Sequence, residues 1–449
     1  MPQFLPRTAD RPALLVELDH LVRRSAKPVL LLLATIGAVA AASPARAQVI
    51  GPAPAMSEQP LTLAEALRLA ADEQPSVAAF QSEAQAAEQA AVAARTLPDP
   101  SLTAGLQNYP VTGRTAFDPT RDDMTMFTVG FMREQVRRSR REAEAARLRA
   151  EALVSRTGAT AQELRVRRDV MIAWINAVEA RAKQRLLARL VSDLVVNRQV
   201  ITAGVPTGSS TPATALEAQA EVALAQAQLA EARGQEARAR AEMRRWVGSA
   251  AVRPVPDTIP AFAAPDEVAT TPSLGDHPQV RVADAQGEAA RRQVDVARNE
   301  RRPNLTWSVM YGLRPSYDDM ISAQVSIPLQ INRRGLQDRR IAEANARADA
   351  ARLRAEDARR ELEGAWGMAQ ADYRSADAQL AVIDTQAVPS LEASFKAAEA
   401  RYASGQGSLE VPLTLVRRYV EVTVQSLEQQ ARRARAAAEL AYLSQDVLQ

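Results

Sequence analysis

Four short stretches of the chain alternate apolar and polar residues, and this period of two predicts β-strands. In one of them Trp307 and Val309 share a side, while Thr306 and Ser308 share the other. Each expected strand therefore presents one apolar and one polar face. The expected strands are residues 101–109, 124–132, 304–313 and 320–329.

Long tracts rich in Ala, Arg, Glu and Gln separate the strands and predict helices. Residues 133–200 contain no proline and only one glycine, so this tract alone predicts a helix about 100 Å long at 1.5 Å per residue. A similar tract at residues 334–403 contains Pro389, which predicts a kink or a restart of the helix. Shorter helices are expected at residues 76–96 and 213–246.

The expected helix at residues 213–246 carries a stripe of uncharged residues at alternating spacings of three and four. Such a stripe predicts the face on which the helix packs closely against a neighbour, although a helix so rich in alanine also produces one partly by chance. The stripe comprises Ala213, Leu216, Ala220, Ala223, Ala227, Ala230, Gly234, Ala237 and Ala241.

The same order of elements occurs twice along the chain, which indicates an internal repeat. Pro75 matches Pro278 at an offset of 203 residues, and Gly204 matches Gly405 at an offset of 201. Each copy contains a helix, two strands, a very long helix, a tight turn and a returning helix. The expected division is a signal peptide at residues 1–47, a first repeat at 48–252, a proline-rich connector at 253–277 and a second repeat at 278–449.

The signal peptide is predicted from three features in sequence. Arg23, Arg24 and Lys27 precede an apolar run at residues 28–42, and small residues follow, with cleavage expected after Ala47. A membrane anchor is the alternative, but the run is shorter than the roughly 20 residues that a spanning helix needs.

The amino-acid composition excludes several classes of function. The 56 basic and 53 acidic residues leave a net charge of +3, which gives no electrostatic footprint for nucleic acid. The chain has no cysteine, so disulfides, thiolate metal sites, thiol catalysis and an acyl anchor on an N-terminal cysteine are excluded.

The strand pattern has a consequence for assembly. Strands of about ten residues with alternating faces are typical of transmembrane β-barrels, although a small soluble sheet packed on the helices is an alternative. Four strands cannot close a barrel around a lumen, and open sheet edges are not tolerated in lipid. If the strands cross a membrane, several copies of the chain must share one barrel.

Two segments resemble the TolC-like outer-membrane efflux factors. LTLAEALRLAADEQPSV at residues 61–77 resembles their N-terminal signature, and RYASGQGSLEVPL at residues 401–413 resembles their second helical turn. The resemblance implies a mostly α fold in which long hairpins form an α-barrel tunnel across the periplasm. It also implies a homotrimer, with four strands per chain in one outer-membrane β-barrel. A periplasmic adaptor protein, an inner-membrane pump and outer-membrane lipid would be its partners.

A narrower resemblance concerns the expected substrate. Residues 98–135 resemble the heavy-metal subgroup, which serves cation-exporting resistance-nodulation-division pumps, although VRRSRRE at residues 136–142 stands where many relatives have a Pro-aromatic-Gly-Lys stretch. The resemblance implies a passive exit duct for heavy-metal cations, with a general duct for drugs and small molecules as the alternative. A periplasmic adaptor should have one hairpin with soluble β-domains, and a structural coiled coil should lack the alternating strands.

No catalytic constellation is present in the sequence. Beyond the signal region the one histidine is His277, and there is no phosphate-binding glycine loop, nucleophile elbow or histidine-based zinc pattern. We therefore expect neither an enzyme nor a cofactor. Methionines on the polar side of the strands are candidate ligands for a soft cation such as Cu(I), or fill space at strand ends. They are Met124, Met126, Met132, Met310 and Met320.

Two further regions are candidates for contact with partners. The resemblance implies that the two helical turns meet the adaptor, through Thr202, Gly204, Arg401, Tyr402, Gly405 and Leu409. As simple hairpin turns, they would use Gly204 and Gly405 to supply positive φ. A basic run follows the second strand and is expected to meet lipid head groups, to line the tunnel entrance, or to be a solvated helix start. It comprises Arg133, Arg137, Arg138, Arg140 and Arg141.

Overall fold

The computed structural model describes residues 59–72, 74–262, 273–404, 406 and 410–445. All of them belong to one unit, Ser57–Gln449, by their internal contacts. The expected signal peptide at residues 1–47 lies outside the described residues. None of the described helices is both long enough and apolar enough to cross a membrane.

The helices of the first repeat are organised around one very long element. Pro75 and Pro212 each lie in the first turn of a helix, where the missing N–H breaks no helical hydrogen bond. Thr211 caps the last of these helices, since its Oγ1 accepts from the backbone N–H of Thr214 at 3.2 Å. The elements are α1 (Leu63–Asp72), α2 (Pro75–Ala94), α3 (Arg138–Gly204), α4 (Pro212–Val247) and the 3₁₀ turn η1 (Gly248–Val252).

The second repeat follows the same plan, with one interruption. Its long tract begins as α6, passes through a π-helical turn and continues as α7, with Pro389 in the first turn of α7. This is the restart expected at Pro389, because proline is tolerated only where its missing N–H is not needed. The elements are η2 (Leu274–Asp276), α5 (Pro278–Asn299), α6 (Gln337–Val382), the π turn η3 (Ile383–Ala387), α7 (Val388–Ala403) and α8 (Glu410–Ser444).

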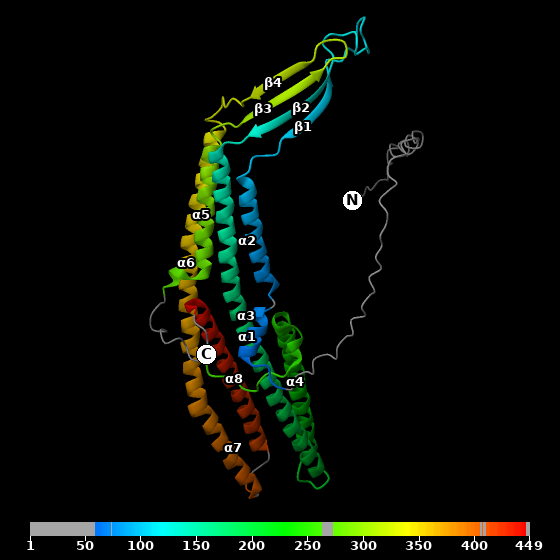
Figure 1. Ribbon diagram of the computed structural model, residues 1–449. Helices are drawn as coiled ribbons and strands as arrows, with labels where there is room; N and C mark the ends of the chain where they lie inside the picture. The colour runs from blue at the N-terminus through cyan, green and yellow to red at the C-terminus, as the bar shows by residue number, and fades with distance from the viewer. Residues whose placement is uncertain (1–58, 73, 263–272, 405, 407–409, 446–449) are drawn as a thin grey trace, which may run out of the picture. The chain divides into compact units, whose positions relative to one another are not determined.

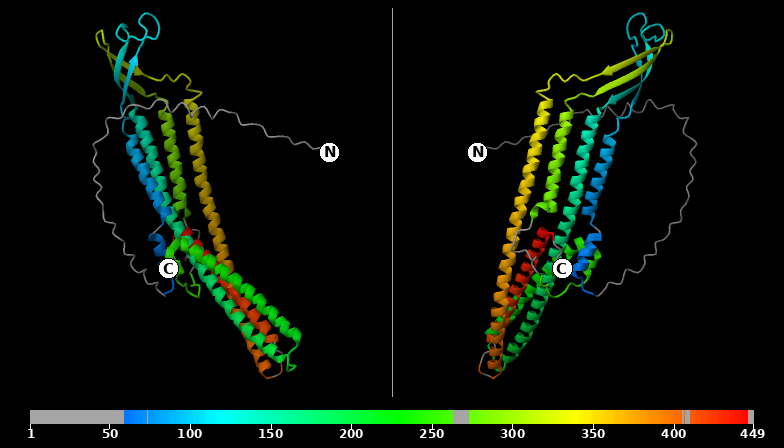
Figure 2. Two further views of the ribbon diagram at one scale, coloured as in Figure 1. Left: turned by 90° about the vertical axis from the view of Figure 1, so that its right-hand side faces the viewer. Right: turned by 60° about the vertical axis from the view of Figure 1, so that its left-hand side comes forward.

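The shorter helices lie along successive parts of the long ones. Phe80 of α2 lies against Gly158 in the first half of α3, whereas α4 packs along the second half, where Leu194 and Val222 share a core. In the second repeat, α5 contacts α6, and α8 contacts both α6 and α7. The strands lie at one end of these helices and the α3–α4 and α7–α8 turns at the other (Figures 1 and 2).

A four-stranded antiparallel sheet in the order β1-β2-β3-β4 joins the two repeats. The strands are β1 (Ser101–Gln107), β2 (Met126–Gln135), β3 (Leu305–Leu313) and β4 (Met320–Ser326). Each lies at one of the four expected stretches; β2 extends three residues further, to Gln135, and β4 ends earlier, at Ser326. The central β2–β3 pairing connects the first repeat to the second, while β1 and β4 are edge strands whose outer sides pair with no other described strand.

The main core lies midway along α3. Trp174 is fully buried among residues of α1, α3, α4 and α8, and its indole N–H donates to the backbone oxygen of Leu61 at 2.9 Å. A buried indole requires such a partner. The bond fixes the segment before α1 against the long helix.

The uncharged stripe on α4 does not face the core of this chain. Its residues, from Ala213 to Ala241, are exposed, whereas Val222, Leu229, Met243 and Trp246 on another face are buried. The larger side chains remove more apolar area from water than alanines do, so they decide which face of α4 turns inward.

Candidate functional site

The sheet has one continuous apolar face, and that face is exposed. Its register places Leu102, Phe131, Val309 and Ala323 opposite one another in a row across all four strands. Leu102 is 64% exposed and Ile321, in the neighbouring row, 75%. A soluble protein rarely leaves so large an apolar patch uncovered, so the face is suited to lipid rather than water.

The opposite face is polar and carries most of the candidate methionines. One row across the sheet is Ser101, Met132, Ser308 and Gln324, and the next is Thr103, Gly130, Met310 and Ser322. Met126 and Met320 lie on this face too, opposite Gln107 and Gly312.

The methionines do not form one cluster with stronger metal ligands. The Nε2 of Gln107 donates to the sulfur of Met310 at 3.3 Å, and Met124 lies before β2 with 58% of its surface exposed. Among the described residues, no group of three or more histidine, cysteine or carboxylate side chains is arranged to hold a metal. Metal binding by these methionines stays a prediction.

The basic run after β2 ties strand ends to helix ends. Arg133 donates through Nε to the backbone oxygen of Pro98 at 3.0 Å, and Arg137 to that of Pro303 at 2.9 Å. Arg141 donates to the backbone oxygen of Arg95. Arg138 and Arg140 pair with Glu142 and Glu300 at 2.7 and 3.6 Å. Each arginine of the run therefore has a partner within the chain.

The helical turns lie at the far end of the helices from the sheet. Thr202 is exposed, and its hydroxyl donates to the backbone oxygen of Arg198 at 2.7 Å. Arg401 and Tyr402 are exposed at the end of α7. Gly405 and Leu409 lie outside the described residues.

The conformation of the first turn corrects the expectation for Gly204. The positive φ, 72°, belongs to Gly208. Gly204 ends α3, and a Cβ there would lie 2.6 Å from Oγ of Ser209. A larger residue at position 204 would therefore displace the hydroxyl groups of Ser209 and Ser210, whereas φ at this position is not positive.

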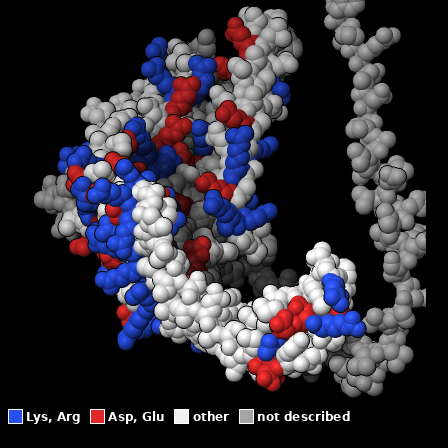
Figure 3. All heavy atoms as spheres, turned by 90° about the horizontal axis from the view of Figure 1, so that it is seen from above, with Lys and Arg blue, Asp and Glu red and all other residues white. Residues whose placement is uncertain are grey.

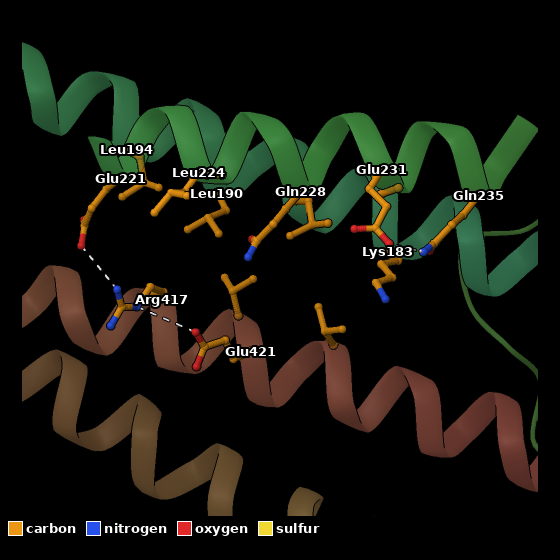
Figure 4. A pocket seen from close by; sticks show the side chains of 15 residues that line it. Lys183, Leu190, Leu194, Glu221, Leu224, Gln228, Glu231, Gln235, Arg417 and Glu421 are labelled. Atoms are coloured by element: carbon orange, nitrogen blue, oxygen red, sulfur yellow. Dashed lines mark hydrogen bonds and ion pairs between the residues drawn. The ribbon is translucent and has the colours of Figure 1, made fainter. Parts of the chain in front are cut away.

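A groove between α3, α4 and α8 was not anticipated from the sequence (Figure 4). It encloses about 450 Å³, and Leu187, Leu190, Leu194 and Val420 contribute its apolar lining. Arg417 of α8 pairs with Glu221 of α4 at 3.4 Å and lies 3.8 Å from Glu421. The pair joins the hairpin of one repeat to that of the other, and a sequence separation of 196 residues gives no local signal for it.

His277, the lone candidate base, is a buried structural residue. It is 1% exposed, its Nδ1 accepts from the backbone N–H of Gln279 at 3.3 Å, and its Nε2 lies 3.2 Å from the backbone oxygen of Tyr442. These partners require a neutral ring with the proton on Nε2. Burial accordingly lowers the pKa of His277, and the residue joins the start of α5 to the end of α8.

The fold is that of outer-membrane channels. CusC, solved in a study of folding and transmembrane channel formation, aligns with a TM-score of 0.69 and 16% identity over 86% of this chain and 92% of its own. VceC, an outer membrane protein of Vibrio cholerae, aligns with a TM-score of 0.68 and 19% identity over 86% and 97%. The MtrE outer membrane channel of Neisseria gonorrhoeae gives 0.67 and 18% over 86% and 89%.

These similarities confirm the expected fold class, mostly helical with long hairpins and four strands per chain. No protein-family model matches the chain, and neither does any curated protein sequence.

Proposed function

We propose that the chain is one subunit of an outer-membrane efflux channel, with its strands in the outer membrane and its helices extending into the periplasm. The observation that carries this proposal is the open-edged sheet with an exposed apolar face and a polar face behind it. The fold shared with CusC, VceC and MtrE supports it. The role is a passive duct, without enzymatic chemistry or a cofactor.

The subunit would act as a homotrimer. In lipid every backbone N–H and C=O must be paired, so the free edges of β1 and β4 require partner strands from other copies. Three copies of four strands give twelve, enough for a closed barrel. The exposed uncharged stripe on α4 is suited to pack against a helix of the neighbouring subunit.

A periplasmic adaptor and an inner-membrane pump complete the proposed system. The α3–α4 and α7–α8 turns lie farthest from the sheet (Figure 1), so they would reach toward the inner membrane. Among the described candidates for adaptor contact, Thr202, Arg401 and Tyr402 are exposed and Gly204 is half-buried; Gly405 and Leu409 complete that set.

For the substrate, we propose heavy-metal cations delivered by a resistance-nodulation-division pump. The resemblance of residues 98–135 to the heavy-metal subgroup is the support for this choice. A general duct for drugs fits the fold equally well, because selectivity in such a system would reside mainly in the pump.

Two measurements test these proposals separately. The mass of the full chain in mild detergent should correspond to three copies, and a stable monomer would falsify the shared barrel. A deletion strain should lose tolerance to copper, silver, zinc, cobalt or cadmium and regain it when the gene is restored. Loss of drug tolerance alone would instead support the general duct.

A further inference from the structure

The segment after β4 keeps the alternation of apolar residues beyond the last paired residue of the strand. Ile327, Leu329 and Ile331 keep the same parity as Ile321 and are 53%, 81% and 89% exposed. Nothing in the described part of the chain covers them. Arg333 and Arg334 come next in the sequence, so two cationic side chains lie within a few residues of these exposed apolar ones.

This segment packs against the end of α5, which brings further arginines to the same junction. The Nε2 of Gln330 donates to the backbone oxygen of Glu300 at 2.7 Å, and Arg301 pairs with Asp338 at 2.6 Å. Residues 300–302 and 333–340 together hold six arginines and two carboxylates. Seen from the sheet end, Lys and Arg gather about the helix ends, beside a sheet that is largely uncharged (Figure 3).

Four exposed arginines of this junction have side chains without a partner among the described residues. Arg301 and Arg340 pair with Asp338 and Glu300. The side chains of Arg302, Arg333, Arg334 and Arg339 make no hydrogen bond or ion pair with any described residue. Arg339 lies within α6, whereas the other three lie in the segments that join the strands to the helices. The basic run after β2 is different, since carbonyl oxygens and carboxylates of the chain itself occupy its guanidinium groups.

We propose that Arg302, Arg333 and Arg334 bind the phosphate groups of anionic phospholipids in the membrane leaflet nearest the helices, with Ile327, Leu329 and Ile331 lying at the acyl-chain boundary above them. The proposal rests on the proposed outer-membrane function. A guanidinium matches a phosphate with two parallel hydrogen bonds, and an arginine placed just outside an apolar band keeps its charge in the head-group region.

The test measures phospholipid bound to the purified full-length protein in detergent, by native mass spectrometry, with phosphatidylglycerol and phosphatidylcholine added at equal concentration. The wild type should prefer phosphatidylglycerol. The triple variant R302Q/R333Q/R334Q should bind it about fivefold more weakly for each arginine removed, the effect of one cation near an anionic surface. Removing these partnerless side chains leaves every contact in the chain intact.

The matched control is R233Q/R238Q/R244Q, which replaces three exposed arginines of α4 whose side chains also make no hydrogen bond or ion pair with described residues. Its phosphatidylglycerol binding should equal that of the wild type. Equal losses in the two triple variants would overturn the proposal by showing a general charge effect. Displacement of the lipid by an equal concentration of inorganic phosphate would also overturn it, in favour of a free-phosphate site.

The same spectra report the number of protein chains, which separates this inference from the proposed function. A monomer would contradict the channel itself. A trimer that binds both lipids equally would contradict only the role of the three arginines.

Discussion

Arg417 of α8 and Glu221 of α4 lie 3.4 Å apart and form an ion pair between the two helical hairpins. Their side chains are 54% and 43% exposed, and such exposed pairs contribute only about 0–1 kcal/mol to stability. The pair therefore contributes little to the stability of the fold, and we expect its main effect to be on the relative position of the two hairpins.

Reversing this charge should change the channel more than its stability. R417E places a third carboxylate beside Glu221 and Glu421, so we expect the hairpins to separate and single-channel conductance in planar bilayers to rise, with little change in melting temperature. E221R added to R417E restores an opposite-charge pair and should return conductance toward the wild-type value. Equal conductance in all three proteins would show that the pair has no such role.

Trp174 should dominate the stability of the helical core. Trp174→Ala leaves a cavity and an unpaired oxygen at Leu61, and we expect the free energy of unfolding to fall by about 3–5 kcal/mol. Thermal unfolding followed by circular dichroism measures the loss. Trp174→Phe keeps most of the volume and should cost less, while Met368→Ala, at a position 67% exposed, should be near neutral.

The sequence predicted the strands better than the packing of the helices. The alternation of apolar and polar residues is a reliable signal in the sheet because each strand has one apolar face and one polar face. Adjacent residues such as Ile321 and Ser322 therefore identify the two faces from the sequence. The α4 stripe does not identify the face that packs within the chain, because alanine is compatible with both an exposed and a buried helix face. The packing of Val222 and Leu229 against α3 determines which face of α4 is buried, and the sequence alone does not show this packing.

Contacts between residues far apart in the sequence were beyond sequence reasoning for a related reason. His277 looked like a loop residue beside a proline, yet it caps α5 and contacts Tyr442, 165 residues away. Arg133, Arg137 and Arg141 looked free because their partners are backbone oxygens, which leave no trace in the sequence. In both cases the fold, rather than local spacing, supplies the partner.

His277 should make stability fall on acidification. Because its pKa is lowered in the folded protein, the unfolded chain binds the proton first. Its contribution is therefore fully present above its ordinary pKa of about 6.5 and is lost as pH falls from there through the lower folded value. Melting temperature measured between pH 7.5 and 5 should show this slope.

His277→Asn provides the comparison, because asparagine can still cap α5 but does not titrate in this range. The difference between wild type and variant should shrink or reverse as pH falls. Glu439 acts in the opposite direction, since burial raises its pKa, but it is common to both proteins and cancels in the difference. A difference that stays constant with pH would rule out the histidine as the cause.

Two adjacent residues of β4 test which face of the sheet meets lipid. Ile321 is on the apolar face and Ser322 on the polar face, and both are exposed on the same edge strand. Arginine on a lipid-facing strand position costs about 2–4 kcal/mol near the bilayer centre, whereas a lumen position tolerates it. Ile321→Arg should therefore reduce the amount of trimer recovered from outer membranes, while Ser322→Arg should assemble normally and lower the conductance for cations. If the two variants assemble equally well, the apolar face does not meet lipid, and a soluble sheet packed on the helices becomes the better description.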